Sequence, residues 1–269
     1  MVQSHPEFPH WPRKEPDADQ WQRELRFAER VQAMLSGAGT FAVPGASAAG
    51  CSIPHYAVGG DYYDIVPLPD GGMRLMVADV MGKGFGPAMI MTMVRSAVRF
   101  ATREAASPGT LLKQLNDLFY RDLQQVGSFV TVSCTDYRPV SRTLTVAGAG
   151  HPYPLLFRSG GMRRIEARGV SIGMLPDRQY AEQVVPVEPG DRLVVFSDGI
   201  LEARDSEGRE IGVAGLEGLV RTTAGPAGPA LLAAILSRVT ASAWEVRDDV
   251  TLAVVDFTDP TESGSVGRG

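Results

Sequence analysis

Cysteine and histidine are scarce in this chain of 269 residues. Only two cysteines occur, Cys51 and Cys134, and no Cys-x-x-Cys spacing is present. The four histidines show no His-x-x-x-His spacing and no pairing with cysteine. A zinc site needs a group of such ligands, so the sequence argues against one. Both cysteines follow or lie within apolar segments, which favours buried free thiols over a disulfide.

Long apolar runs and basic clusters are also missing. The longest uninterrupted apolar run, Ala230–Leu236, has seven residues, whereas a membrane helix needs roughly 20. The N-terminus has neither a basic start nor an apolar stretch, so we expect no signal peptide. The net charge is −5 and no Lys/Arg cluster reaches four residues, which argues against nucleic acid or membrane as a partner. We therefore expect a soluble, cytoplasmic protein.

The chain divides into four predicted parts. Residues 1–18 carry four prolines among scattered charges and are predicted to be disordered. Residues 19–50 hold a regulatory or linker helix, with Asp19 as its N-cap, and a lead-in of small residues. Residues 51–257 form the main domain, and residues 258–269 form a flexible tail.

Apolar residues recur at helical spacing within residues 19–36. They follow one another at steps of three and four: Trp21, Leu25, Ala28, Val31 and Leu35. This stripe either packs on the chain's own domain or meets another chain as a dimer or control helix, and the sequence does not decide between the two. A homodimer through this helix is thus one prediction, although two heptads are too few to predict a coiled coil.

The main domain combines many short strands with two pairs of helices. Strands are predicted at 52–58, 62–67, 73–79, 129–136, 141–147, 155–158, 162–167, 181–187, 192–197 and 250–257. Helices are predicted at 87–104, 108–123, 213–222 and 229–244. Hairpin turns such as Pro69–Gly72 indicate mainly antiparallel sheets, and the segregated helices favour two stacked sheets with helices outside.

Four aspartates stand at the ends of predicted strands, and they share a local pattern. Asp61, Asp79, Asp198 and Asp248 have apolar strand residues on one side and glycine or a second acid on the other. Because they are far apart in the chain, only a tertiary site would use all four. Carboxylates without histidine or thiolate suit the hard cations Mg²⁺ and Mn²⁺. Taken singly, each aspartate is more simply a turn or helix cap, but together they favour a metal site.

Five segments occur in the order of a known motif series between Cys51 and Phe257. They are GGDYYD, ADVMGKGFGPAM, AGHPYPLL, GDRLVVFSDGILEARDSEG and RDDVTLAVV. The chain therefore resembles the metal-dependent protein phosphatases (protein phosphatase 2C-like), specifically their bacterial RsbU/SpoIIE-like branch. ELRFAERVQAML also resembles the helix that commonly precedes this domain. The resemblance implies an α+β fold, a four-layer αββα sandwich of two mainly antiparallel sheets flanked by helices.

The resemblance also implies a centre of two Mn²⁺ or Mg²⁺ ions and a role for each acid. Asp79 would bridge the two ions, with the Val80 carbonyl beside it. Asp61 would approach one ion, while Asp198 and Asp248 would hold the other. A metal-activated water would then hydrolyse phosphoserine or phosphothreonine on a regulatory protein, which in this branch is typically an anti-anti-sigma factor.

The roles of a few residues stay open. Asp249 is either a further metal ligand or a supporting acid. Lys83 either attracts the substrate phosphate or an acidic partner, or is a solvated turn residue. His151 is favoured as structural rather than as a general acid. Eukaryotic protein phosphatase 2C has a histidine two positions after the bridging aspartate, but this chain has Met81, so no general acid is assigned.

Two alternatives to an active phosphatase are considered. The first is a catalytically weak or inactive regulatory binding module of the same fold, against which the presence of all four acids argues. The second is a metal-dependent hydrolase of nucleotides or small phosphoesters. No phosphate-binding loop of the GxxxxGK[ST] type supports it.

Overall fold

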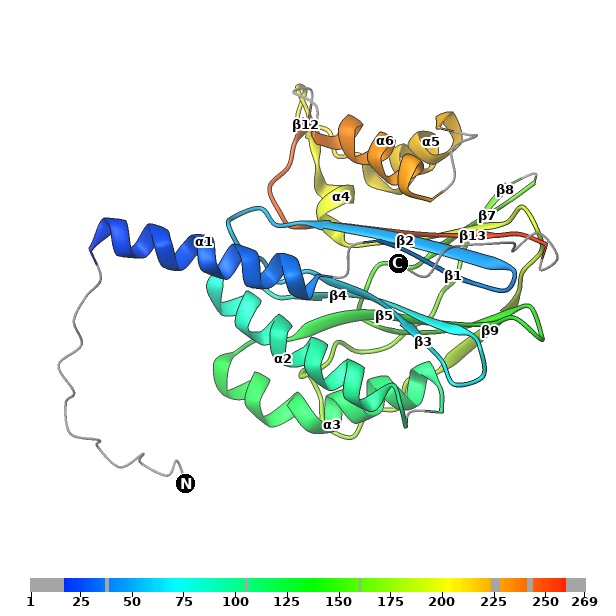
Figure 1. Cartoon of the computed structure of the whole chain (residues 1–269), viewed down its shortest axis with the longest axis horizontal. Helices are drawn as coiled ribbons and strands as arrows, with labels where there is room; N and C mark the ends of the chain where they lie inside the picture. Colours follow the sequence, from blue (N-terminus) through cyan, green and yellow to red (C-terminus); the bar gives the residue numbers. More distant parts are fainter. Residues whose placement is uncertain are drawn as a thin grey trace.

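Two sheets stacked face to face form the centre of the fold (Figure 1). The computed structural model describes residues 17–36, 39–104, 106–159, 161–223, 228–240 and 244–259. Residues 1–16 and the residues beyond 259 lie outside this part, and so do most of the two segments predicted as disordered and flexible. The division of the chain into four parts stays a prediction.

One sheet has the strand order β3-β4-β5-β6-β9 and the other the order β1-β2-β13-β10-β7-β8. Every ladder between the named strands is antiparallel. The strands of the first sheet are β3 (Tyr62–Pro67), β4 (Met73–Val80), β5 (Val130–Arg138), β6 (Thr143–Ala149) and β9 (Glu182–Pro186). Those of the second are β1 (Gly39–Val43), β2 (Ala46–Ile53), β7 (Leu155–Arg158), β8 (Gly161–Arg164), β10 (Arg192–Phe196) and β13 (Val250–Phe257).

Helices cover the outer faces of both sheets. The first sheet is covered by α2 (Phe85–Ala101) and α3 (Pro108–Val126). The second is covered by α4 (Asp198–Glu202), α5 (Gly212–Thr222) and α6 (Pro229–Thr240). The predicted four-layer αββα sandwich of the α+β class is confirmed. Among the described helices, none is both long and apolar enough to span a bilayer.

Strand β4 shows how the core leads to a carboxylate. Its side chains alternate, so Leu75 and Val77 pack between the two sheets while Met76 and Ala78 pack under α2 and α3. Because both faces of the strand are covered, it is apolar without interruption from Leu75 to Ala78. Asp79 is the first residue of β4 that is not fully buried, so the strand delivers this carboxylate to the edge of the core.

Residues 37–50 were predicted as a linker or an extended lead-in, but the described residues 39–50 are part of a sheet rather than a linker. They form β1 and most of β2, which pairs with β13 in the centre of its sheet. Small residues are needed there because the sheets approach closely. A Cβ atom on Gly50 would lie 2.4 Å from the ring of Tyr63. The small residues that made this stretch resemble a linker are therefore required by the packing of a strand.

Several helix boundaries also differ from the prediction, and two of them change the role of a named residue. The N-cap of α1 (Ala18–Leu35) is Asp17 rather than Asp19, and its carboxylate accepts a hydrogen bond from the Gln20 N–H at 2.8 Å. The last helix is described as far as Thr240, and Trp244, which was predicted to end it, does not belong to it. Trp244 belongs to β12 (Trp244–Glu245), which pairs with β11 (Arg204–Asp205).

Helix α1 has little contact with the rest of the chain. Gln32 is its one buried residue, and Trp21, Phe27 and Met34 are exposed. Figure 1 shows its N-terminal part extending away from the sandwich. Its C-terminal end is fixed by Arg95 of α2, whose Nε donates to the Leu35 carbonyl at 2.7 Å.

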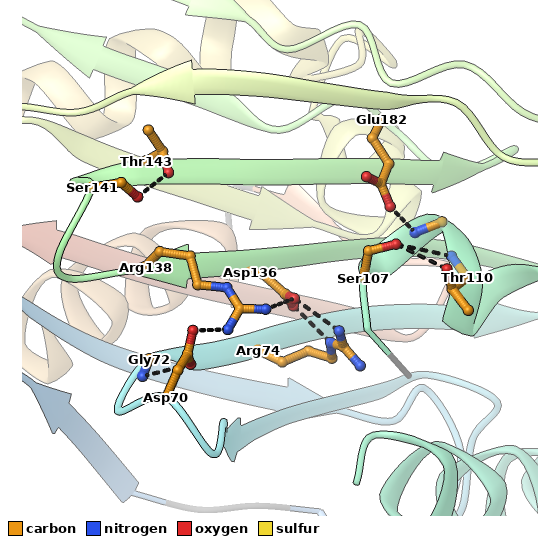
Figure 2. A network of polar contacts seen from close by, with 11 residues as sticks. Asp70, Gly72, Arg74, Ser107, Thr110, Asp136, Arg138, Ser141, Thr143 and Glu182 are labelled. Atoms are coloured by element: carbon orange, nitrogen blue, oxygen red, sulfur yellow. Dashed lines mark hydrogen bonds and ion pairs between the residues drawn. The ribbon is translucent and has the colours of Figure 1, made fainter. Parts of the chain in front are cut away.

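A buried ion pair joins β4 to β5 at the end of β4 opposite Asp79 (Figure 2). Arg74 donates to both carboxylate oxygens of Asp136, through Nε at 2.6 Å and Nη2 at 2.8 Å. The two side chains are 0% and 1% exposed. Arg138 connects the same carboxylate to Asp70 in the β3–β4 turn.

Arg74→Met should lower the free energy of unfolding by about 3–5 kcal/mol, because it leaves the Asp136 charge buried without its main partner. The double variant Arg74→Met/Asp136→Leu should recover most of this loss, since it removes both charges. Urea unfolding measures both, with Arg209→Ala of the surface pair Arg209–Asp205 as a control expected to change stability by less than about 1 kcal/mol. Equal stability of Arg74→Met and the wild type would contradict the prediction.

Candidate metal centre

The four predicted aspartates lie at neighbouring strand ends. Asp61 directly precedes β3 and Asp79 is near the end of β4, and these two ends pair in the antiparallel ladder. Asp198 follows β10 and Asp248 precedes β13, and these ends are likewise adjacent. The sheet topology therefore explains each pair, and the stacking of the two sheets brings the pairs together.

Glycines allow these segments to approach one another. A Cβ atom on Gly60 would lie 2.8 Å from the Val80 carbonyl oxygen, and one on Gly59 would lie 2.2 Å from a carboxylate oxygen of Asp249. A Cβ atom on Gly199 would lie 2.0 Å from the Asp249 carbonyl oxygen. These distances are shorter than any side chain tolerates, so the glycines beside the acids are a condition for the acids to meet.

The carboxylates influence one another electrostatically. The pKa of Asp79 is raised to about 7, first by burial and then by the charges of Asp198, Asp248, Asp249 and Glu202. Such shifts arise when like charges share a site with little solvent. Asp79 is therefore at the centre of an acidic cluster in which full ionisation is unfavourable.

Asp61 and Asp198 have similar surroundings. Burial, followed by the charge of Asp79, raises the pKa of Asp61 well above its usual range. Ser197 opposes this shift by donating its hydroxyl to Asp61 at 2.7 Å. The pKa of Asp198 is raised by burial and then by Asp248, while the charge of Lys83 lowers it.

Lys83 is a cation within this acidic cluster. Its Nζ forms an ion pair with Asp248 Oδ2 at 2.9 Å, and it also donates to the Arg247 carbonyl. Both side chains of the pair are 31% exposed. The ammonium group thus neutralises part of the charge around Asp248 and Asp198.

Asp249 is used in backbone hydrogen bonds. Its Oδ1 accepts from the His55 N–H and its Oδ2 from the Gly60 N–H, both at 2.7 Å. The residue is 3% exposed. These bonds hold the loop that carries Asp61 in place. Asp249 therefore has the contacts expected of a supporting acid.

The residues present suit two hard cations. The donors are carboxylates and the backbone carbonyl of Val80, which are the ligand types that Mg²⁺ and Mn²⁺ prefer. As they stand, no three His, Cys, Asp or Glu side chains in the described ranges surround a single point closely enough to hold a metal ion. Their oxygens instead accept from Ser197, Lys83 and backbone amides, so metal binding would require small side-chain rotations. After burial, the charges of the neighbouring acids also raise the pKa of Asp79, and bound cations would relieve this repulsion.

Two further polar residues of the motif segments, Asp64 and His151, are structural. Asp64 is 2% exposed and accepts a bidentate ion pair from Arg99 of α2, with Nε at 2.6 Å and Nη2 at 2.9 Å. His151 is buried, and its Nδ1 lies 2.8 Å from the Thr131 hydroxyl. Burial lowers the pKa of His151 to about 3, so the ring is neutral and unsuited to protonate a leaving group.

Three residues near the acids were missed from the sequence. Ser197 bonds Asp61, Glu202 adds charge near Asp79, and Gln32 of α1 contacts the Asp61 loop. Gln32 could have been noticed, because it is a polar residue next to Val31 in the apolar stripe. Ser197 and Glu202 lie in the VVFSDGILE segment, but nothing in their spacing distinguishes them from ordinary cap residues.

A family model for Stage II sporulation protein E (SpoIIE) matches residues 69–258, more than half of the chain. The chain belongs to the SpoIIE family. The phosphoserine phosphatase RsbU of Bacillus subtilis is 28% identical over 187 residues, which cover 69% of this chain and 55% of RsbU. The matched part of this SpoIIE-family chain spans about half or less of the length of each of these curated relatives.

Solved structures show the same fold. The SiaA-PP2C domain of Pseudomonas aeruginosa is 20% identical, with a TM-score of 0.75 over 89% of this chain and 98% of that one. The RsbU and RsbW domains of Rv1364c from Mycobacterium tuberculosis are 25% identical, with a TM-score of 0.66 over 81% and 61%. These similarities support the αββα architecture and its relation to the RsbU/SpoIIE branch.

In metal-free protein at about pH 8, Asp79→Asn should raise the free energy of unfolding by about 1–3 kcal/mol, because it removes a charge that its neighbours disfavour. Since the pKa of Asp79 is raised from 3.8 to about 7 in the folded state, this gain should be small at about pH 4.5, grow up to about pH 7 and stay level above it. Urea unfolding in EDTA at both pH values measures the change.

The matched control is Asp122→Asn, which changes an exposed aspartate of α3 and should have little effect at either pH. A loss of stability in Asp79→Asn at about pH 8, or a gain of equal size at both pH values, would show that the carboxylates do not repel one another.

Proposed function

We propose that this SpoIIE-family chain is a metal-dependent serine/threonine protein phosphatase that hydrolyses phosphoserine or phosphothreonine on a regulatory protein. The observation that carries the proposal is the group of acids around Asp79, whose charges, together with burial as the larger cause, raise its pKa to about 7. A charge excess of this kind suits a site that binds divalent cations and, through them, a phosphate dianion. The similarity to RsbU favours a phosphoserine protein over other phosphoesters.

The proposed roles follow the positions of the acids. Asp79 holds both cations, with the Val80 carbonyl beside it, and Asp61 supports one of them. Asp198 and Asp248 hold the other. When bound, Mn²⁺ or Mg²⁺ would neutralise the phosphate and lower the pKa of a water that attacks phosphorus.

Other residues of the chain would orient these acids. Ser197 fixes Asp61 through its hydroxyl, and the backbone amides of His55 and Gly60 fix Asp249. A cation bound to Asp248 would repel the Lys83 ammonium group, which lies 2.9 Å from the same carboxylate. We therefore propose that Lys83 turns from Asp248 towards the substrate phosphate in the loaded enzyme.

The proposed substrate is an anti-anti-sigma type of phosphoprotein in the cytoplasm. This proposal is supported by the sequence similarity to RsbU and by the structural similarity to the RsbU and RsbW domains of Rv1364c. No nucleic acid or membrane partner is proposed, because the net charge is −5 and the sequence has no Lys/Arg cluster of four residues.

With Mn²⁺, the purified chain should hydrolyse p-nitrophenyl phosphate and a phosphoserine peptide, and EDTA should abolish both activities. Asp198→Asn and Asp248→Asn should each lower kcat by about 100-fold or more, because each removes charge that positions the cations and phosphate. Asp122→Asn should leave kcat unchanged. Full activity in EDTA would exclude the metal mechanism, and an inactive wild type would favour the regulatory binding module.

We also propose that α1 controls the site and forms a homodimer through residues 19–36. Gln32 Nε2 donates to the Gly59 carbonyl at 2.9 Å, and the Gly59 N–H donates to Gln32 Oε1 at 3.0 Å. Gly59 lies two residues before Asp61, so movement of α1 would be transmitted to that acid. The largely exposed helix offers its apolar stripe to a second copy.

Two α1 variants should separate control from association. Gln32→Ala should raise the Mn²⁺ concentration for half-maximal activity by about tenfold without changing the molar mass from light scattering. Leu25→Glu should reduce the mass from dimer to monomer, because it places a charge in the stripe. The proposal is wrong if Gln32→Ala behaves like the control Gln22→Ala and Leu25→Glu keeps the wild-type mass.

A further inference from the structure

A groove of about 380 Å³ lies beside Asp198 on the outer side of the six-stranded sheet. Its walls include Tyr153 from the loop before β7, Leu201 of α4 and Val213 of α5. Ligand sites of proteins commonly enclose about 300–1,000 Å³, so the groove suits a short extended stretch of polypeptide rather than a folded element. Because Asp198 is one of its lining residues, anything bound there lies next to the acidic cluster.

Arg164 gives this groove a positive charge. It is the last residue of β8, it is exposed, and it lines the same groove as Asp198. In the described part of the chain, no ion pair involves Arg164, whereas the nearby Arg158 is bound to Asp191 at 2.5 Å. The donors of the Arg164 guanidinium group are therefore available to a ligand, and they suit a carboxylate.

The neighbouring Arg163 faces the other way, because side chains alternate along a strand. Arg163 pairs in register with Leu156, which packs between the sheets, and lines a separate cavity of about 260 Å³. Arg164 pairs in register with Leu155, which packs on the helix side. The two arginines therefore carry the same charge on the same strand, but only Arg164 lines the groove beside Asp198.

We propose that this groove binds the polypeptide segment next to the substrate phosphoserine, and that Arg164 pairs with an acidic side chain of that segment. This inference rests on the proposed phosphatase function, because Asp198 is one of the acids assigned to the cations. The phosphate occupies the acidic cluster, Tyr153, Leu201 and Val213 contact an apolar side chain, and Arg164 selects an acidic one. Arg164 is thus a specificity-determining residue that does not touch the reacting phosphorus.

The test compares the wild type, Arg164→Glu and Arg163→Glu on three substrates with Mn²⁺. These are p-nitrophenyl phosphate, a phosphoserine peptide with flanking glutamates, and the same peptide with lysines in place of the glutamates. Arg164→Glu should raise KM for the glutamate peptide by about tenfold with little change in kcat, and should lower KM for the lysine peptide. Arg163→Glu should match the wild type on all three substrates.

Binding of both peptides, followed by fluorescence anisotropy, separates this inference from the phosphatase proposal. If the wild type hydrolyses none of the substrates but prefers the glutamate peptide through Arg164, the groove assignment stands and the phosphatase proposal fails. If Arg164→Glu binds and hydrolyses the glutamate peptide like the wild type, the groove assignment is wrong. Equal losses on p-nitrophenyl phosphate and on both peptides would overturn it as well, because Arg164 would then act on the phosphate itself.

Discussion

Repulsion among the carboxylates around Asp79 is the interaction on which the functional account depends. The apolar layers on both sides of β4 fix the position of Asp79, and the pairing of β10 with β13 fixes Asp198 beside Asp248. The fold therefore holds like charges together although each of them lowers stability when ionised. Proteins keep such unfavourable groups where function requires them, and oxygen anions at this density are typical of divalent cation sites.

The protein compensates part of this charge with its own groups. Ser197 donates to Asp61, backbone amides donate to Asp249, and Lys83 pairs with Asp248. These contacts compensate part of the charge, whereas among the described residues no side-chain hydrogen bond or ion pair stabilises the Asp79 carboxylate. The same contacts explain why the acids do not already form a closed ligand set.

Much of the fold could be predicted from local patterns. The Pro-Asp-Gly-Gly turn between two apolar stretches specifies the hairpin of β3 and β4, whose register places Tyr62 opposite Ala78. Strands β1 and β2 could not be predicted this way. The small residues around Gly50 are required by the close approach of the other sheet, where Tyr63 lies. Trp244 likewise pairs with Asp205 across a long stretch of chain, and no helical periodicity contains that information.

The acids of the site could be predicted because each has a recognisable position at a strand end. Their partners could not, since the bonds of Ser197 to Asp61 and of Asp249 to the His55 and Gly60 amides join residues far apart in the chain. The most direct test of the central claim is a crystal structure with Mn²⁺ that uses the anomalous scattering of the metal. We predict two anomalous peaks that share Asp79, with Asp198 and Asp248 at one of them. Crystals grown in Mn²⁺ with no peak between these side chains would contradict the account.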